Sequence, residues 1–179
     1  MTVPALRLAY LYVGSDDVAR DTRWYRDALG AEIVWAFDRF GAVVAALRLG
    51  EGPLLLLADH RPAGECRSIY AVDDLESALA EVRRAGTTRI VEVGVPPGPC
   101  AIFDDPSGNP VGLIEETRPG RMELGFCDPE NRAALRPPWP RVRRHAPPID
   151  ASARGKSRVG ECDKKNAADF GSTNFGGNE

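Results

Sequence analysis

Two pairs of adjacent aspartates, Asp16-Asp17 and Asp73-Asp74, are the first residues along the chain whose type and spacing could do chemistry. Neighbouring carboxylates can transfer protons or bind a divalent metal. Each pair, however, comes directly before an apolar pattern of helical spacing. At a helix start a carboxylate accepts hydrogen bonds from free backbone amides and complements the helix dipole. The sequence therefore favours helix capping over catalysis for both pairs.

Cysteine and histidine give little support to nucleophilic or zinc chemistry. No two cysteines form a C-x-x-C pair, and neither His60 nor His145 neighbours a cysteine in the sequence. Structural thiols in a reducing compartment are the simpler interpretation. The run Asp104–Asn109 has turn chemistry and lacks the ligand spacing of a calcium loop. The four cysteines are Cys66, Cys100, Cys127 and Cys162.

Composition indicates a globular chain that neither spans a membrane nor binds nucleic acids in general. Of its 179 residues, 43% are apolar, and no apolar run approaches the roughly 18 residues of a membrane span. The first residues show no secretory signal, so we expect a cytoplasmic protein. The formal net charge of −3 argues against general nucleic-acid binding.

The charge changes sign after residue 117. Residues 1–117 hold 11 basic and 18 acidic residues, whereas residues 118–179 hold 12 basic and 8 acidic ones together with seven prolines. We therefore predict a domain over 1–117 and a mostly disordered or extended tail over 118–179. The basic cluster 141–145 could contact an acidic partner or a nucleic acid, but a solvated charge run in a flexible tail is the favoured interpretation.

The first 117 residues contain a doubled unit. Tyr10-Leu-Tyr-Val-Gly-Ser-Asp-Asp17 aligns with Arg67-Ser-Ile-Tyr-Ala-Val-Asp-Asp74 at an offset of 57, and a second alignment has the same offset. Each half reads strand, helix, then three strands. The first helix would be capped by Ser15 or Asp16 and end at Gly30, and the second would be capped by Asp73 and end at Gly86. The later strands are predicted at about 31–37, 40–49, 53–58, 88–94, 99–104 and 109–116.

Three local motifs of this doubled unit resemble those of the vicinal-oxygen-chelate superfamily, which includes glyoxalase, bleomycin-resistance and dioxygenase proteins. The resemblance covers about residues 5–116. It implies an α+β fold in which two βαβββ modules, about 5–60 and 66–117, form a curled mixed sheet around a cup. The motifs are Val13–Asp17 with Trp24–Gly30, Tyr70–Leu75 with Ala85-Gly86, and Phe103–Glu115.

The resemblance also implies four positions that hold a divalent metal in typical members. They fall on Tyr10, Leu55, Arg67 and Gly112. None of these is a usual metal ligand, and a slip by one residue along the leucine run 54–57 would change nothing. The nearest alternatives, His60, Glu115 and Glu116, lie at strand ends. We therefore expect no metal and no cofactor.

Strand alternation predicts what lines the cup instead. The lining would be apolar and aromatic with one or two guanidinium groups, which suits an aromatic or anionic organic ligand. Arg67 could hold an anionic group, or could simply pair with Glu65, and the aromatic residues could equally serve only for packing. The predicted ligand-binding residues are Tyr10, Tyr12, Trp35, Arg48, Leu55, Arg67, Phe103 and Gly112.

The leading functional hypothesis is therefore a metal-free small-molecule binding protein of the bleomycin-resistance type. The alternative is an enzyme of the superfamily, a lyase, isomerase or dioxygenase with an unrecognised metal or with a site built on Tyr10 and arginine. A third hypothesis is an interaction protein that recruits a partner through the basic tail. The resemblance further implies a homodimer with two cups.

Overall fold

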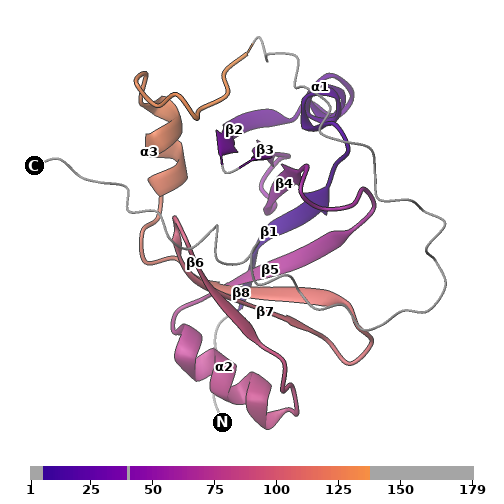
Figure 1. Ribbon diagram of the computed structural model, residues 1–179, viewed down its shortest axis with the longest axis vertical. Coiled ribbons are helices and arrows are strands. Elements are labelled where there is room, and N and C mark those ends of the chain that lie inside the picture. The colour runs from indigo at the N-terminus through magenta and orange to yellow at the C-terminus, as the bar shows by residue number, and fades with distance from the viewer. Residues whose placement is uncertain (1–5, 40, 138–179) are drawn as a thin grey trace, which may run out of the picture.

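The computed structural model describes residues 6–39 and 41–137, and within them it contains eight strands and three helices (Figure 1). The predicted order of strand, helix and three strands occurs twice, which confirms the α+β duplication. The first half comprises β1 (Arg7–Gly14), α1 (Val18–Leu29), β2 (Glu32–Arg39), β3 (Ala42–Arg48) and β4 (Leu54–Ala58). The second half comprises β5 (Cys66–Val72), α2 (Leu75–Arg84), β6 (Val91–Val95), β7 (Gly98–Asp104) and β8 (Pro110–Glu115), and α3 (Arg121–Cys127) follows it.

All eight strands form one mixed sheet in the order β2-β3-β4-β1-β5-β8-β7-β6. Within each half the first and last strands run parallel, and the other pairs are antiparallel. The halves join through the antiparallel pair β1 and β5, where Tyr12 lies opposite Arg67 and Tyr10 opposite Ile69. The two first strands therefore meet at the centre of the sheet, and each half contributes one arm of the curl (Figure 1).

Alternation along the strands separates two faces. Leu11 and Leu57 pack with the cluster beneath α1, while Leu79 and Leu113 belong to the corresponding cluster beneath α2. The opposite, concave face carries a third cluster, which includes Trp35, Val44 and Leu56 with the partly buried Tyr10 and Tyr12. Burial of one face under each helix thus leaves a second apolar face inside the curl.

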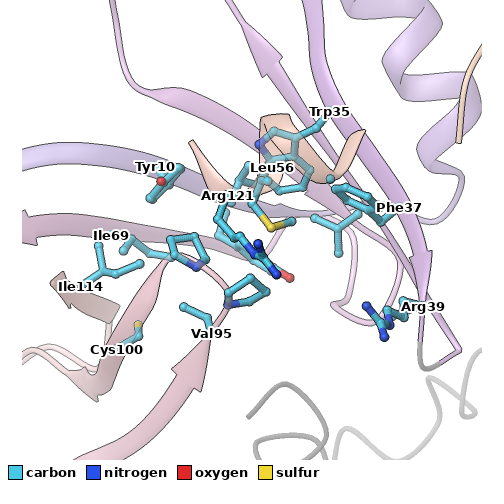
Figure 2. Close-up of a pocket in the computed structure, with 17 residues that line it drawn as sticks. Tyr10, Trp35, Phe37, Arg39, Leu56, Ile69, Val95, Cys100, Ile114 and Arg121 are labelled. Atoms are coloured by element: carbon cyan, nitrogen blue, oxygen red, sulfur yellow. The ribbon is translucent and has the colours of Figure 1, made fainter. Parts of the chain in front are cut away.

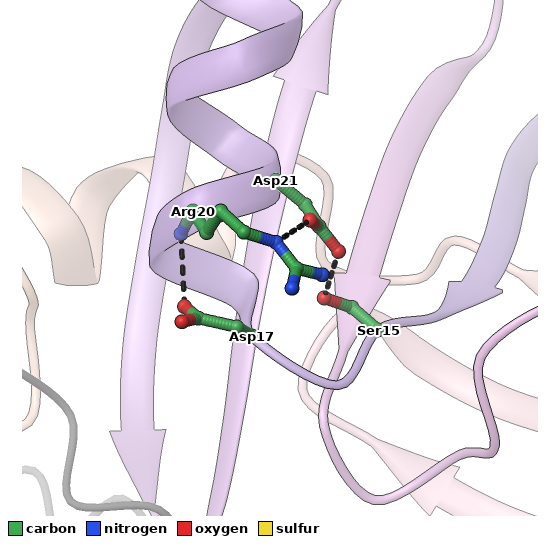
Figure 3. Close-up of polar contacts among 4 residues, drawn as sticks. All are labelled: Ser15, Asp17, Arg20 and Asp21. Atoms are coloured by element: carbon green, nitrogen blue, oxygen red, sulfur yellow. Dashed lines mark hydrogen bonds and ion pairs between the residues drawn. The ribbon is translucent and has the colours of Figure 1, made fainter.

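The helix caps lie one residue later than predicted. Asp17, not Ser15 or Asp16, caps α1 by accepting a hydrogen bond of 2.9 Å from the Arg20 amide (Figure 3). Ser15 instead donates to the Asp21 carboxylate at 2.6 Å. The cap must be the last extended residue before the first turn, and only Asp17 has that position. Gly30 ends α1 at φ 68°, as expected.

The second helix shows the same shift of its cap. Asp74, not Asp73, accepts a hydrogen bond of 3.0 Å from the Ser77 amide and caps α2. The Glu115 carboxylate accepts a further hydrogen bond of 3.0 Å from the Leu75 amide. One aspartate of each pair therefore caps a helix, as the placement of the pairs in the sequence indicated.

The segment after β8 differs from the extended tail that the sequence predicted. Residues 121–127 form α3, and Met122 and Phe126, four residues apart, pack against the concave cluster. The chain then runs along the outer edge of β2, where Leu135 donates to the Ala36 carbonyl at 2.8 Å. A seven-residue helix has too little periodicity to be read from sequence, and tertiary packing stabilises it. The division into a domain of residues 1–117 and a tail stays a prediction, and the basic cluster 141–145 lies outside the described residues.

No helix in the described part of the chain is long and apolar enough to cross a membrane. Three cysteines, Cys66, Cys100 and Cys127, are free thiols, with Cys100 buried and the other two exposed. Cys162 lies outside the described residues.

Candidate ligand-binding cup

The concave face of the sheet and α3 enclose a pocket of about 160 Å³ (Figure 2). Its aromatic residues come from two strands, Tyr10 and Tyr12 from β1 and Trp35 and Phe37 from β2. The Trp35 and Phe37 rings lie 5.9 Å apart between centroids at an angle of 38°. Other apolar lining residues are Val44, Leu56, Ile69, Val95, Pro96, Pro97, Ile114 and Met122.

A bulge in β2 turns Trp35 into the pocket. Ile33 packs beneath α1, and strict alternation would send Trp35 to the same side. The pairing with β3 shifts between Ile33 and Trp35, so one extra residue is inserted and Trp35 and Phe37 face the concave side. The aromatic wall therefore depends on this irregularity.

Tyr10 contributes a neutral phenol to the pocket. Its hydroxyl donates a hydrogen bond of 2.5 Å to Glu116, which also accepts from Arg7 at 2.8 Å. Burial, followed by the hydrogen bond and the negative charge of Glu116, raises the pKa of Tyr10 above its ordinary value. The phenol therefore keeps its proton at neutral pH.

The hydroxyl of Tyr12 lies 3.1 Å from Nε2 of His60, in the turn that follows β4. Burial, with a smaller effect of Arg61 and Arg67, lowers the pKa of His60 to about 4. Burial also raises the pKa of Tyr12. Both partners are thus neutral at pH 7, and the contact is a neutral hydrogen bond.

The pocket lining carries two cationic side chains and no carboxylate. Arg39 comes from the end of β2 and Arg121 from the start of α3. In Figure 2, Arg121 extends to the middle of the pocket, while Arg39 lies beyond Phe37 at one end. The pocket lining is therefore mainly apolar and aromatic, and both of its charged residues are cationic.

The structure brings three of the predicted ligand-binding residues together in this pocket, Tyr10, Tyr12 and Trp35. Arg67 does not line it: the side chain is only 11% exposed and lies 4.0 Å from Glu65, as the pairing interpretation expected. Arg48 is exposed at the end of β3, away from the lining.

Gly112 faces the concave side but is covered. A side chain at this position would begin 3.1 Å from Cγ1 of Ile69, the residue beside it on β5. Ile69 therefore occupies the part of the cup that the absence of a Gly112 side chain leaves open.

The predicted placement of Leu55 and Phe103 in the cup is wrong. Leu55 packs beneath α1 because the parallel register sets Tyr12 beside Leu56, which is the residue that lines the pocket. Phe103 packs beneath α2, and Cys100 is the residue of β7 that lines the pocket. A run of four leucines shows no alternation, so the sequence did not reveal which of them face inward.

Sequence reasoning missed the residues that α3 supplies, Arg121, Met122 and Gly125, because that segment was predicted to lack structure. It also missed Phe37, which alternation from Trp35 would have placed beside it. Pro96 and Pro97, in the turn between β6 and β7, gave no signal for the cup.

The residues present do not fit the metal that the resemblance implies. With Leu56 in place of Leu55, the four positions hold Tyr10, Leu56, Arg67 and Gly112, and only the Tyr10 phenol offers a donor atom. Within residues 6–39 and 41–137, no three His, Cys, Asp or Glu side chains gather as a metal site would require. The alternatives are otherwise engaged: Glu115 accepts a hydrogen bond from the Leu75 amide, Glu116 binds Arg7 and Tyr10, and His60 contacts Tyr12.

Comparison with solved structures finds several proteins of similar fold. The chain resembles methylmalonyl-CoA epimerase from Mycobacterium tuberculosis, with 17% identity and a TM-score of 0.54 over 64% of this chain and 90% of that one. It resembles homoprotocatechuate 2,3-dioxygenase from Brevibacterium fuscum at 22% identity and a TM-score of 0.53, over 69% of this chain and 41% of that one. The hypothetical protein BH1468 from Bacillus halodurans C-125 is similar at 16% identity and a TM-score of 0.54, over 62% of this chain and 94% of that one.

These identities establish a shared fold and no more. No curated protein matches the sequence. The sequence profile of the Glyoxalase/Bleomycin resistance protein/Dioxygenase superfamily, however, matches residues 7–113, which is more than half of the chain. The doubled module, the mixed sheet and this match agree, and the chain belongs to the glyoxalase/bleomycin resistance protein/dioxygenase superfamily.

Proposed function

We propose that this protein binds a small organic ligand in the cup without a metal, in the manner of the bleomycin-resistance branch. The observation that carries the proposal is the replacement of a metal donor set by an apolar, aromatic lining on the concave face. The pocket, at about 160 Å³, is close to the roughly 150 Å³ engineered cavity that accepts benzene. One aromatic ring, or an apolar group of that size, fits inside.

The ligands of similar proteins support a small organic molecule. Methylmalonyl-CoA epimerase has been solved with methylmalonyl-CoA, and homoprotocatechuate 2,3-dioxygenase with 3,4-dihydroxyphenylacetate. Both are organic anions, and the second carries one aromatic ring. We propose an aromatic or anionic organic ligand here as well.

We further propose a cytoplasmic homodimer with one cup in each chain. The resemblance to the superfamily supports the dimer, and the unpaired thiols of Cys66, Cys100 and Cys127 support a reducing compartment. Light scattering after size-exclusion chromatography measures the mass in solution, and a monomer at micromolar concentration would remove the dimer from the proposal.

To test binding, chelator-treated protein is titrated with single-ring organic compounds, and saturation-transfer NMR monitors the binding. We expect saturable binding with one site per chain. Val44→Phe, which fills the pocket, should abolish it, whereas Val91→Phe, at a half-buried strand position outside the lining, should not. Binding that survives Val44→Phe would place the ligand elsewhere and refute the proposal.

An enzyme of the superfamily is the second candidate, and the Tyr10–Glu116 pair favours it. A neutral phenol in the pocket could transfer its proton to a bound substrate, and the tyrosinate left behind would take up a proton from water, while the Glu116 carboxylate orients the hydroxyl. Turnover that persists after exhaustive chelation and is lost in Tyr10→Phe would support such a site. Turnover that is unchanged in Tyr10→Phe would exclude it.

A further inference from the structure

Ile69 lies on β5, a central strand of the sheet, at the boundary between the two halves of the protein. On one side it lies opposite Tyr10 of β1, and on the other it lies beside Gly112 of β8. Tyr10 and Ile69 line the pocket, whereas Gly112 does not. Figure 2 shows Ile69 and Ile114 on the opposite side of the pocket from Phe37. Ile69 is therefore part of the pocket wall that the second half supplies.

Gly112 gives the Ile69 side chain room to lie over β8. A Cβ atom at position 112 would lie only 3.1 Å from Cγ1 and 3.5 Å from Cγ2 of Ile69. Carbon atoms prefer a separation of about 3.5–4.0 Å, so even a methyl group here would press on Ile69. The φ of Gly112 lies outside the left-handed region that favours glycine. The backbone conformation therefore does not require a glycine, and what the missing side chain provides is space for Ile69.

The pocket lining stops at Ile69 along this row of residues. The next residue across the sheet after Gly112 is Ile102 of β7. Its neighbours Ala101 and Phe103 pack beneath α2, so alternation turns Ile102 to the concave face. Ile102 does not belong to the lining. Ile69 thus closes the pocket toward the part of the concave face that lies over Gly112 and Ile102.

We propose that Ile69, lying over Gly112, sets the size limit of the cup, and that the ligand is a single-ring compound without a fused second ring. This inference rests on the proposed binding function and specifies its ligand class. The pocket of about 160 Å³ already matches the roughly 150 Å³ cavity that accepts benzene, so a second ring needs the space that Ile69 occupies. Ile69 cannot easily move aside, because a β-branched side chain is restricted at χ1 and Tyr10 lies next to it.

The test compares a one-ring probe with its two-ring counterpart, phenol with 2-naphthol, by calorimetric titration. We expect wild type to bind phenol about ten-fold more tightly than 2-naphthol. Ile69→Ala should bind 2-naphthol about ten-fold more tightly than wild type does, because the second ring then buries its apolar surface in the opened space. The matched control Ile102→Ala removes the same atoms on the other side of Gly112 and leaves Ile69 in place, so it should change neither affinity.

A second variant tests whether Gly112 acts through Ile69. Gly112→Ala should push Ile69 toward the pocket and weaken phenol binding about three-fold. In the Ile69→Ala background the added methyl group has room, so Gly112→Ala should have almost no effect there. An equal loss in both backgrounds would mean that Gly112 does not position Ile69, and this part of the inference would be wrong. Should Ile69→Ala fail to fold, Ile69→Val removes one methyl group and should give a smaller gain for 2-naphthol.

The outcomes separate this inference from the proposed function. If wild type binds 2-naphthol as tightly as phenol, the cup has no size limit at Ile69, and the inference fails while binding in the cup stands. If the Ile69 variants still exclude 2-naphthol, another residue sets the limit and the inference likewise fails. If wild type binds neither probe nor any other single-ring compound, the binding function itself is wrong.

Discussion

Substituting Phe126 by alanine should detach α3 from the cup and leave the sheet intact. The Phe126 ring packs against the concave cluster, contacts Phe37 edge-on and lies 5.6 Å from the guanidinium carbon of Arg136. Full burial of a phenylalanine contributes up to about 3 kcal/mol, and an aromatic pair adds about 1 kcal/mol. Because the ring is only half-buried, we expect the local opening free energy of α3 to fall by about 2 kcal/mol.

Native-state hydrogen exchange measures this local opening. A loss of about 2 kcal/mol corresponds to roughly 30-fold faster exchange. The effect should appear at the amides that α3 and the following segment protect, including Asp38, which donates to the Ala133 carbonyl at 2.9 Å. Amides at the centre of the sheet, such as Leu11 on β1, should keep their protection.

The matched control is Leu124→Ala on the same helix. Leu124 is 68% exposed, so its removal should change exchange by less than about 0.5 kcal/mol. If Phe126→Ala instead lowers protection across the whole sheet, α3 belongs to the cooperative core and the reasoning is wrong. If it changes nothing, ring packing is not what holds the helix.

Three further outcomes follow from contacts described above. Asp17→Ala should lower the free energy of unfolding by about 1 kcal/mol in urea titration because it removes the cap of α1, whereas Asp16→Ala should have little effect. The folded protein holds the pKa of His60 at about 4, below the ordinary value of 6.5. Between pH 4 and 6.5 the unfolded chain therefore binds more protons than the folded protein. The free energy of unfolding should fall as the pH drops from 6.5 toward 4, and His60→Gln should flatten that slope. Burial raises the pKa of the Cys100 thiol to about 11, so Cys100 should react with iodoacetamide far more slowly than the exposed Cys66; equal rates in native protein would contradict the burial.

The fold could be predicted from the sequence because the internal repeat and the alternation of side chains along the strands pointed to the same architecture. The constant offset of 57 identified two equal halves, and alternation in β1 assigned Tyr10 and Tyr12 to one face and Leu11 to the other. Gly30 ended the first helix where its left-handed conformation required it. These are local patterns, and the structure preserves them.

The candidate site was harder to predict because its lining depends on long-range arrangement. Which leucine of β4 enters the cup depends on the register with β1, and four identical residues do not encode it. The inward turn of Trp35 fits the pocket only because β2 contains a bulge. Arg121 lies on a short helix that is stabilised by the contact of its Phe126 ring with Phe37, and Phe37 lies 84 positions before Arg121 in the chain.

The bridge between Phe37 and Ala134 has a consequence for solubility. The two ends of an open sheet present unpaired backbone groups to which another chain can add a strand. Here the returning segment occupies the β2 end, with hydrogen bonds at Ala36 and Asp38, while β6 forms the other end. A chain truncated after Arg118 would expose the β2 edge together with the aromatic wall of Trp35 and Phe37. We expect such a chain to self-associate through strand addition at β2, so the segment that completes the cup also keeps the protein from aggregating.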